Sequence, residues 1–192
     1  MQDQYAAAFG GWNFIEFQGD QVIVNPLRLS QDVINEMEHN LLLCFTGSTH
    51  VSGRIIEDQV SRYERGDAQN VEGLRTQKRL AVEMKNLILR RRLRELGELM
   101  DEAWAWKKKI SPHISNPRID EIYETAKRAG ALGGKLNGAG GGGFMMFYCD
   151  FEKKHEVAEV LKRMGCTIRD FAFDFHGVQT WRVNAAGTNG SH

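Results

Sequence analysis

The chain has 192 residues, which is enough for one domain or for one domain and part of another. Its 25 basic side chains equal its 25 acidic ones, so the sequence lacks the basic excess that dedicated nucleic-acid-binding proteins carry. Apolar residues make up 42% and charged residues 26% of the chain, and these fractions exclude the disordered and fibrous classes.

Two short β-favouring runs stand near the start of the sequence. They are Asn13–Phe17 and Gln21–Val24, and the intervening Gly19-Asp20 predicts a turn between them. A continuous apolar run follows at Leu41–Thr46 and stops at Gly47. This pattern favours a strand that is buried on both faces.

A long helical region is predicted after this strand. Its apolar residues recur at steps of three, four and seven, which predicts one stripe that faces the core. The members of this stripe are Val82, Leu89, Leu93, Leu96, Met100 and Trp104. The basic clusters Arg90–Arg92 and Lys107–Lys109 lie among acidic residues, so we interpret them as a solvated helix face rather than as a nucleic-acid contact.

The next helix has clear signals at both ends. Asn116 suits the N-cap, Pro117 suits the first helical position, and Gly130 suits the end of the helix. Its expected buried side consists of Ile119, Ile122, Tyr123 and Ala126.

Four further elements follow in the C-terminal part of the sequence. They are a strand at Phe144–Cys149, a helix from Asp150 through Met164, and two strands at Thr167–Phe175 and Val178–Val183. Helices packed on one face of a mainly antiparallel sheet form an α+β architecture. We therefore expect an α+β fold with ferredoxin-like topology.

Three cysteines, Cys44, Cys149 and Cys166, lie far apart and form no Cys-x-x-Cys pair. We expect reduced core residues rather than a disulfide framework or a zinc site, and we predict no metal site. No apolar run approaches the roughly 20 residues that span a bilayer, and the N-terminus lacks the regions of a signal peptide. The sequence thus predicts a cytoplasmic protein without a membrane partner.

The most unusual stretch is Gly130–Phe144, GALGGKLNGAGGGGF. A dinucleotide-binding fingerprint would follow a strand and open a helix, but here a helix is expected before the glycines and a strand after them. Walker A spacing fails as well, because Ala129 and Leu136 stand at two of its required positions. The four glycines Gly140–Gly143 permit a close backbone approach or N–H groups that face an anion. A tight connection is the alternative, but it needs fewer glycines.

The segment Lys135–Phe144 resembles the third conserved motif of the GHMP kinases, a family that includes galactokinase, homoserine kinase and mevalonate kinase. In that family this loop lies beside the phosphates, where two domains join. The resemblance implies a phosphate- or nucleotide-proximal role for Gly138, Ala139, Gly140, Gly141, Gly142 and Gly143. Lys135 either reaches a substrate phosphate or only solvates the end of the helix, and the sequence does not decide between these readings.

Other segments are similar to the bacterial heptose-7-phosphate kinases, namely Gln2–Gly11, Leu41–Gly47 and Ile114–Tyr148. This similarity implies an ATP-dependent sugar kinase that transfers the γ-phosphate to the anomeric hydroxyl of a heptose 7-phosphate, with ATP and Mg²⁺ as cofactors. It also implies a remnant of the N-terminal domain at residues 1–30, a C-terminal domain at 31–184 and a flexible tail at 185–192.

The opening motif bears on the mechanism. Asp3-Gln4-Tyr5 matches the Asp-Gln-aromatic motif of galactokinase-like enzymes, which implies that Asp3 is the catalytic base. Taken without the resemblance, an aspartate this near a terminus is ordinarily solvated. His50 departs from the family pattern, in which an arginine often stands, and we leave it out of the expected site.

Family members carry a glycine- and serine-rich nucleotide loop upstream of the Asp-Gln motif, and nothing in this sequence resembles it. We therefore expect a missing N-terminal half, negligible kinase activity of this chain alone, and self-association through unpaired strand edges in Gln2–Val24. Two alternatives stay open. The chain is a non-catalytic interaction or ligand-sensing module derived from such a kinase, or it belongs to a kinase for another sugar such as galactose or fucose.

Overall fold

The computed structural model describes residues 2–48 and 52–181. The chain forms two compact units, and each is described here by itself. The first unit comprises Met1–Arg28 and Phe173–His192, and the second comprises Leu29–Ala172. The domain boundaries expected from the sequence stay a prediction.

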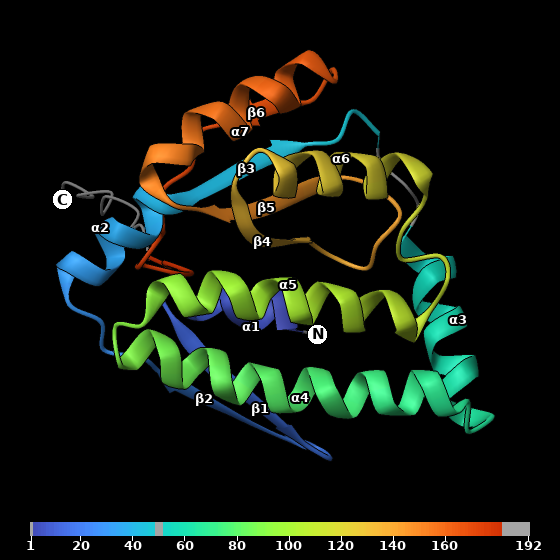
Figure 1. Ribbon diagram of the computed structural model, residues 1–192. Coiled ribbons are helices and arrows are strands. Elements are labelled where there is room, and N and C mark those ends of the chain that lie inside the picture. The colour runs from blue at the N-terminus through green and yellow to red at the C-terminus, as the bar shows by residue number, and fades with distance from the viewer. Residues whose placement is uncertain (1, 49–51, 182–192) are drawn as a thin grey trace, which may run out of the picture. The chain divides into compact units, whose positions relative to one another are not determined.

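The first unit consists of a helix and a hairpin, which are α1 (Gln2–Phe9), β1 (Asn13–Gln18) and β2 (Gln21–Pro26) (Figure 1). The hairpin was expected, and its strands pair antiparallel through a turn at Gly19, whose φ is +64°. The ring of Tyr5 on α1 packs edge-on against Phe17 on β1, with 5.8 Å between the ring centroids. This aromatic contact joins the helix to the hairpin.

The segment after Ala172 contains no strand through residue 181, so the prediction of a strand at Val178–Val183 is wrong within the described residues; residues 182 and 183 lie outside them. The prediction for Thr167–Phe175 is correct only for Thr167–Arg169. Beyond Arg169 the backbone leaves the ladder. From Phe173 the chain belongs to the first unit, within which the Gly11 N–H donates to the Asp174 carbonyl at 2.7 Å.

The second unit contains a four-stranded sheet in the order β4-β5-β3-β6, and all of its pairs are antiparallel. The strands are β3 (Leu41–Phe45), β4 (Ala131–Leu136), β5 (Phe144–Cys149) and β6 (Thr167–Arg169). Helices join β3 to β4 and β5 to β6, and a short loop joins β4 to β5. This is the β-α-β-β-α-β connectivity of ferredoxin-like folds, and it confirms the expected α+β class.

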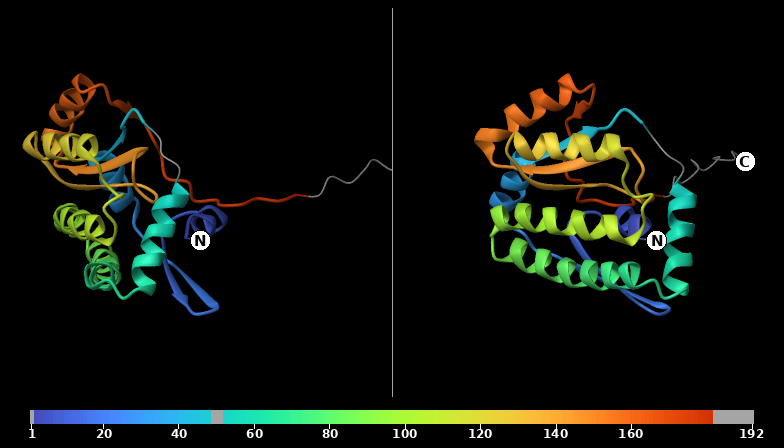
Figure 2. Two further views of the ribbon diagram at one scale, coloured as in Figure 1. Left: turned by 90° about the vertical axis from the view of Figure 1, so that its right-hand side faces the viewer. Right: turned by 45° about the vertical axis from the view of Figure 1, so that its right-hand side comes forward.

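The helices of the second unit are α2 (Gln31–Asn40), α3 (Ser52–Glu64), α4 (Ala68–Leu89), α5 (Leu93–Ile110), α6 (Pro117–Arg128) and α7 (Phe151–Arg163). Figures 1 and 2 show α6 and α7 over one face of the sheet, α5 running beside β4, and α4 lying alongside α5. The expected Asn116 cap is confirmed, because its Oδ1 accepts the Ile119 N–H at 3.0 Å. The strand at Phe144–Cys149 and the helix after Asp150 are confirmed too. None of the described helices is long and apolar enough to cross a membrane.

The single helical stripe expected between Val82 and Trp104 is wrong. The chain reverses at Arg90–Arg92, where Arg91 has a φ of +58°, and this reversal separates α4 from α5. The stripe belongs to α5, whose members are buried, whereas Val82 and Leu89 on α4 are exposed. Neither glycine nor proline marks the reversal, so local propensity gave no signal for it.

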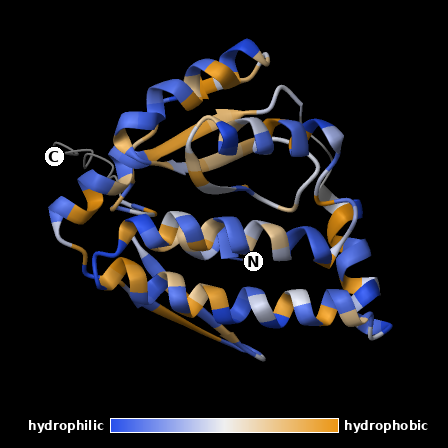
Figure 3. Ribbon diagram, viewed as in Figure 1, coloured by the Kyte–Doolittle hydropathy of each residue, from blue (hydrophilic) through white to orange (hydrophobic). Residues whose placement is uncertain are grey.

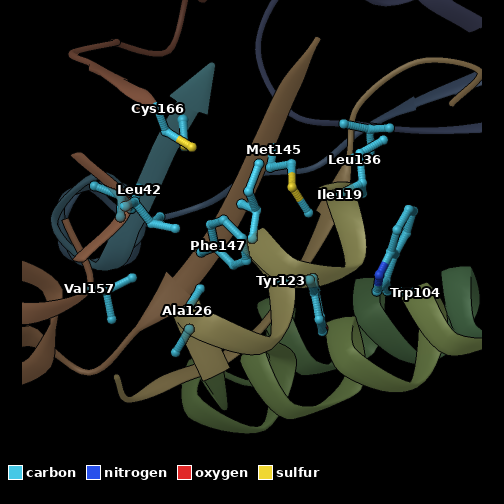
Figure 4. Packing of buried hydrophobic residues seen from close by; sticks show 14 of the residues in the cluster. Leu42, Trp104, Ile119, Tyr123, Ala126, Leu136, Met145, Phe147, Val157 and Cys166 are labelled. Atoms are coloured by element: carbon cyan, nitrogen blue, oxygen red, sulfur yellow. The ribbon is translucent and has the colours of Figure 1, made fainter. Parts of the chain in front are cut away.

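The hydrophobic core of the second unit lies between the sheet and the helices α6 and α7. Leu42, Met145 and Phe147 project from β3 and β5 towards residues such as Tyr123 and Val157 on those helices (Figure 4). Figure 3 shows the central strands coloured mostly hydrophobic and the helices alternating along their length. As expected from the sequence, the three cysteines are buried, and they are free.

The glycine-rich stretch expected to be one loop contains a strand in its first half. This strand is β4, and it places Gly133 against the backbone of α5. A Cβ added to Gly133 would lie 2.1 Å from the Gly97 carbonyl oxygen, and one added to Gly134 would lie 2.6 Å from the Phe147 ring. These two glycines therefore serve packing, and only the second half of the stretch is a loop.

Replacing a core residue tests this packing. We expect Phe147→Ala to lower the free energy of unfolding of the second unit by about 3–5 kcal/mol, because Phe147 is fully buried. The matched control is Phe151→Ala, whose side chain is 64% exposed and whose loss should cost no more than about 0.5 kcal/mol. Urea unfolding followed by circular dichroism measures both. Equal losses would contradict the core described above.

Candidate functional site

The glycine loop, defined as Asn137–Gly143, connects β4 to β5. The Asn137 N–H donates to the Phe144 carbonyl at 2.8 Å and closes the base of the loop. Four of its glycines have positive φ angles, +74° at Gly138, +134° at Gly140, +79° at Gly141 and +103° at Gly143. Side chains rarely adopt these backbone conformations, so the run of glycines is needed for this path of the chain.

The glycines of the loop are required for different reasons. A Cβ added to Gly140 would lie 2.7 Å from the Cα of Ile114 and 2.9 Å from its carbonyl oxygen. A Cβ added to Gly138 or Gly143 would meet nothing within 4 Å. Gly140 therefore rests on the backbone below it, whereas Gly138 and Gly143 lie where the loop is open and need glycine only for their φ angles.

The segment between α5 and α6 forms the floor of the loop. Ile114 in this segment is completely buried, and its carbonyl oxygen accepts the Gly141 N–H at 2.9 Å. Asn116 adds a second tie, because its Nδ2 donates to the Gly141 carbonyl at 3.1 Å. The same side chain caps α6, so one residue fixes both the start of a helix and the middle of the loop.

Thr46 holds the far end of the loop. Its backbone N–H and its Oγ1 both lie 2.9 Å from the Gly143 carbonyl oxygen and donate to it, and the Gly143 N–H donates to the Ser48 carbonyl at 2.7 Å. Thr46 is only 5% exposed, so these bonds are shielded from water. The sequence marked Thr46 only as the end of a strand, and no local signal indicated this contact.

Lys107 on α5 holds the near end of the loop. Its Nζ donates to the carbonyl oxygens of Leu136 at 2.9 Å and Gly138 at 2.8 Å. Burial and the nearby charge of Lys135 lower the pKa of Lys107 to about 8. The interpretation of the lysine cluster as a solvated face is therefore wrong for this residue. Its spacing of three from both Trp104 and Ile110, which are buried, was the signal that could have identified it.

The loop offers several backbone donors. The N–H groups of Gly138, Ala139, Gly140 and Gly142 donate to no other group among residues 2–48 and 52–181. N–H groups left over in a glycine-rich turn, next to two lysines, match what a phosphate group requires. In the same part of the chain no group of three or more His, Cys, Asp or Glu side chains could hold a metal ion, so we assign no Mg²⁺ ligand.

The remaining residues expected in the site are less constrained. Asp3 is exposed in the first turn of α1 and belongs to the first unit, while the glycine loop belongs to the second. Lys135 is exposed on β4, opposite Met146 of β5. The roles of Asp3 and Lys135 stay predictions. His50 lies outside the described residues.

A polar network holds the floor segment in place. Ser111 is fully buried, and its Oγ donates to Asp58 Oδ2 on α3 at 2.5 Å. The hydrogen bond from Ser111, followed by the charge of Arg62, holds the pKa of Asp58 below its ordinary value of 3.8. Asn70 on α4 is also fully buried and donates to the Ile110 carbonyl at 2.9 Å. Helices α3 and α4 thus anchor the end of α5 and the segment on which the loop rests.

Two glycine substitutions separate packing from backbone conformation. We expect Gly140→Ala to cost about 3 kcal/mol or more, because its Cβ would overlap the Ile114 backbone and its φ of +134° disfavours a side chain. Gly138→Ala meets only open space and should cost about 1 kcal/mol. Urea unfolding measures both costs, and a cost at Gly138 that equals that at Gly140 would refute the close approach.

The Asp58 contact makes stability depend on pH. Because the pKa of Asp58 is lowered in the folded state, its carboxylate stabilises the fold above the unfolded-state pKa, and this contribution is lost as pH falls through the folded-state pKa. We expect Asp58→Asn to melt below the wild type at pH 7, and the gap to close below about pH 4. The exposed neighbour Glu57 provides the control, Glu57→Gln, which should show no gap. A gap for Asp58→Asn that does not change with pH would contradict the carboxylate's role.

Comparisons with known proteins point to one family. The profile of the family described as GHMP kinases C terminal matches residues 84–166, which include α5, α6, the glycine loop and α7. The D-glycero-alpha-D-manno-heptose 7-phosphate kinase of Campylobacter jejuni is 38% identical over 183 residues, which cover 95% of this chain and 53% of the relative. The chain therefore spans about half the length of this relative.

Two further proteins extend the comparison. The bifunctional fucokinase/GDP-fucose pyrophosphorylase of Arabidopsis thaliana is 31% identical over 165 residues, covering 84% of this chain and 16% of that protein. A solved structure of a D-glycero-D-manno-heptose 1-phosphate kinase from Bacteroides thetaiotaomicron superposes with a TM-score of 0.69 at 30% identity. This superposition covers 96% of this chain and 49% of the other. Similarity in sequence and in fold thus extends over nearly the whole chain.

Proposed function

The chain contains the C-terminal domain of a GHMP kinase, and from this premise we propose that it forms the C-terminal portion of an ATP-dependent sugar kinase. The proposed reaction transfers the γ-phosphate of ATP to the anomeric hydroxyl of a heptose 7-phosphate. The observation that carries the proposal is the glycine loop: its N–H groups without an acceptor among the described residues, together with the neighbouring lysines, suit a phosphate. The similarity to the Campylobacter jejuni kinase supports heptose 7-phosphate as the acceptor.

Phosphoryl transfer requires of a protein mainly that it position the reactants and neutralise their charge. ATP, with its Mg²⁺, supplies the phosphoryl group when it is bound. The loop of this chain would contribute backbone donors at defined positions, because Thr46 and Lys107 bond its two ends and the Ile114–Asn116 segment bonds its middle. Donors that are already oriented need no rearrangement when negative charge develops.

Asp3 would act as the general base. A carboxylate that accepts the proton of the attacking hydroxyl raises the nucleophilicity of that oxygen. The exposure of Asp3 on α1 leaves its carboxylate accessible to a substrate. We keep the cytoplasmic location expected from the sequence as part of this proposal.

A chimera tests the proposed reaction. In it this chain replaces the matched segment of the Campylobacter jejuni kinase, and ATP-dependent phosphorylation of heptose 7-phosphate is measured. We expect turnover in the chimera, and we expect Asp3→Asn to lower kcat by roughly 10²–10⁴-fold while the KM for the sugar changes little. The control is Asp20→Asn on the exposed β1–β2 turn, which should leave kcat unchanged.

Parallel reactions separate the alternatives. The chain by itself is expected to show negligible turnover, because its sequence contains no recognisable glycine- and serine-rich nucleotide loop. Fucose and galactose are supplied to the chimera as competing acceptors. A chimera that phosphorylates one of them in preference would overturn the acceptor, and a folded chimera that binds ATP yet phosphorylates no sugar would favour a non-catalytic module. An unchanged kcat in Asp3→Asn would remove Asp3 from the mechanism.

A further inference from the structure

Lys107 differs from its two neighbours in what surrounds its charge. Lys108 pairs with Asp120 at 3.0 Å, and the Lys109 ammonium lies over the Trp106 ring, 3.7 Å from the ring centroid. Lys107 makes its two hydrogen bonds to the neutral carbonyl groups of Leu136 and Gly138. In the part of the chain that the structure describes, no carboxylate pairs with it.

The surroundings of Lys107 are unfavourable for a cation. The side chain is half-buried, and the like charge of Lys135 on β4 acts on it. Removing an ammonium from water costs free energy unless an opposite charge compensates for it. An ammonium kept in such surroundings, next to N–H donors and without a paired carboxylate among the described residues, would be stabilised by a bound anion.

We propose that Lys107 is an anion-binding residue of the glycine loop: its ammonium holds the Leu136 and Gly138 carbonyls with two of its protons and presents its third to a phosphate group bound by the loop N–H groups. An ammonium has three donors, and two of them are used within the described residues. The inference rests on the phosphate role of the loop proposed above and adds a residue outside the glycine motif. Lys107 thereby links the conformation of the loop to its occupancy.

This assignment has a thermodynamic consequence that a purely structural clamp lacks. A bound anion favours the charged form of a neighbouring ammonium, so it raises the pKa of that ammonium. By reciprocity, the protonated protein binds the anion more tightly than the deprotonated one, and by the same factor. The charged group that lowers the pKa of Lys107 is Lys135 on β4. The neighbouring Lys108 on the same helix pairs with Asp120 on α6. Within the described residues, no ion pair joins a carboxylate to Lys107.

The test uses inorganic pyrophosphate as the probe and the full chain as the protein. Lysine labelled with ¹³C at the ε position allows the pKa of Lys107 to be measured by NMR, with and without saturating pyrophosphate. We expect a value near 8 without the anion and a rise of about one unit with it, which corresponds to a tenfold change in affinity between the two charge states. Lys109, over its tryptophan, is the internal control and should not shift.

Two variants of Lys107 provide the second readout. Lys107→Met should weaken pyrophosphate binding by roughly tenfold or more, whereas Lys107→Arg, which keeps the charge and the donors, should retain most of it. Lys109→Met should bind as the wild type does. The amide signals of the loop glycines show whether each variant keeps the loop in place.

The outcomes distinguish this inference from the proposed function. Binding of pyrophosphate with no change in the pKa of Lys107, and equal affinity in Lys107→Met, would overturn the inference and leave the kinase proposal intact. No binding to the wild type would overturn the inference and remove the loop from the support for the kinase proposal, which the chimera tests separately. A raised pKa together with weakened binding in Lys107→Met supports the inference.

Discussion

The contact between Gly140 and the Ile114 backbone is the constraint on which the site depends. It brings the glycine loop down onto the segment that joins α5 to α6, so closely that no side chain fits between them. Once this contact is made, the Gly141 N–H reaches the Ile114 carbonyl and Asn116 reaches the Gly141 carbonyl. The N–H groups that remain then have fixed positions. The loop is therefore rigid because of its floor, although its composition alone would make it one of the most flexible parts of the chain.

The segment between α5 and α6, on which the loop rests, is itself anchored by residues that are distant in the sequence. Ser111 and Asn70, both fully buried, fasten the segment to α3 and α4, which lie outside the sheet layer. A substitution on α3 can therefore alter the loop without touching it. This arrangement explains how a glycine-rich loop offers backbone donors at defined positions, as the recognition of a phosphate requires.

The sequence predicted those elements whose signals are local. The Asn116 cap, the continuous apolar runs of β3 and β5 and the helix that ends at Gly165 each carry their own markers, and the structure has all of them. The reversal at Arg90–Arg92 carries neither glycine nor proline. The strand β4 contains Gly133 and Gly134, whose lack of a side chain leaves room for α5 and for Phe147. Because of these glycines, the composition of β4 is typical of a loop. A contact between distant segments, such as that of Thr46 with the loop, leaves little trace in a local pattern.

The ties of the glycine loop also bear on the order of folding. Thr46 and Gly143 are separated by 97 residues in the chain, and the bond from Asn116 to Gly141 spans 25. Bringing together two residues that are far apart in the chain lowers its conformational entropy, and this loss precedes the stabilisation that their contacts provide. Helices such as α4 and α5 depend mainly on neighbours in the sequence and can form early. The glycine loop can therefore take its shape only after β3 has joined the sheet, so its amide signals mark a late step of folding.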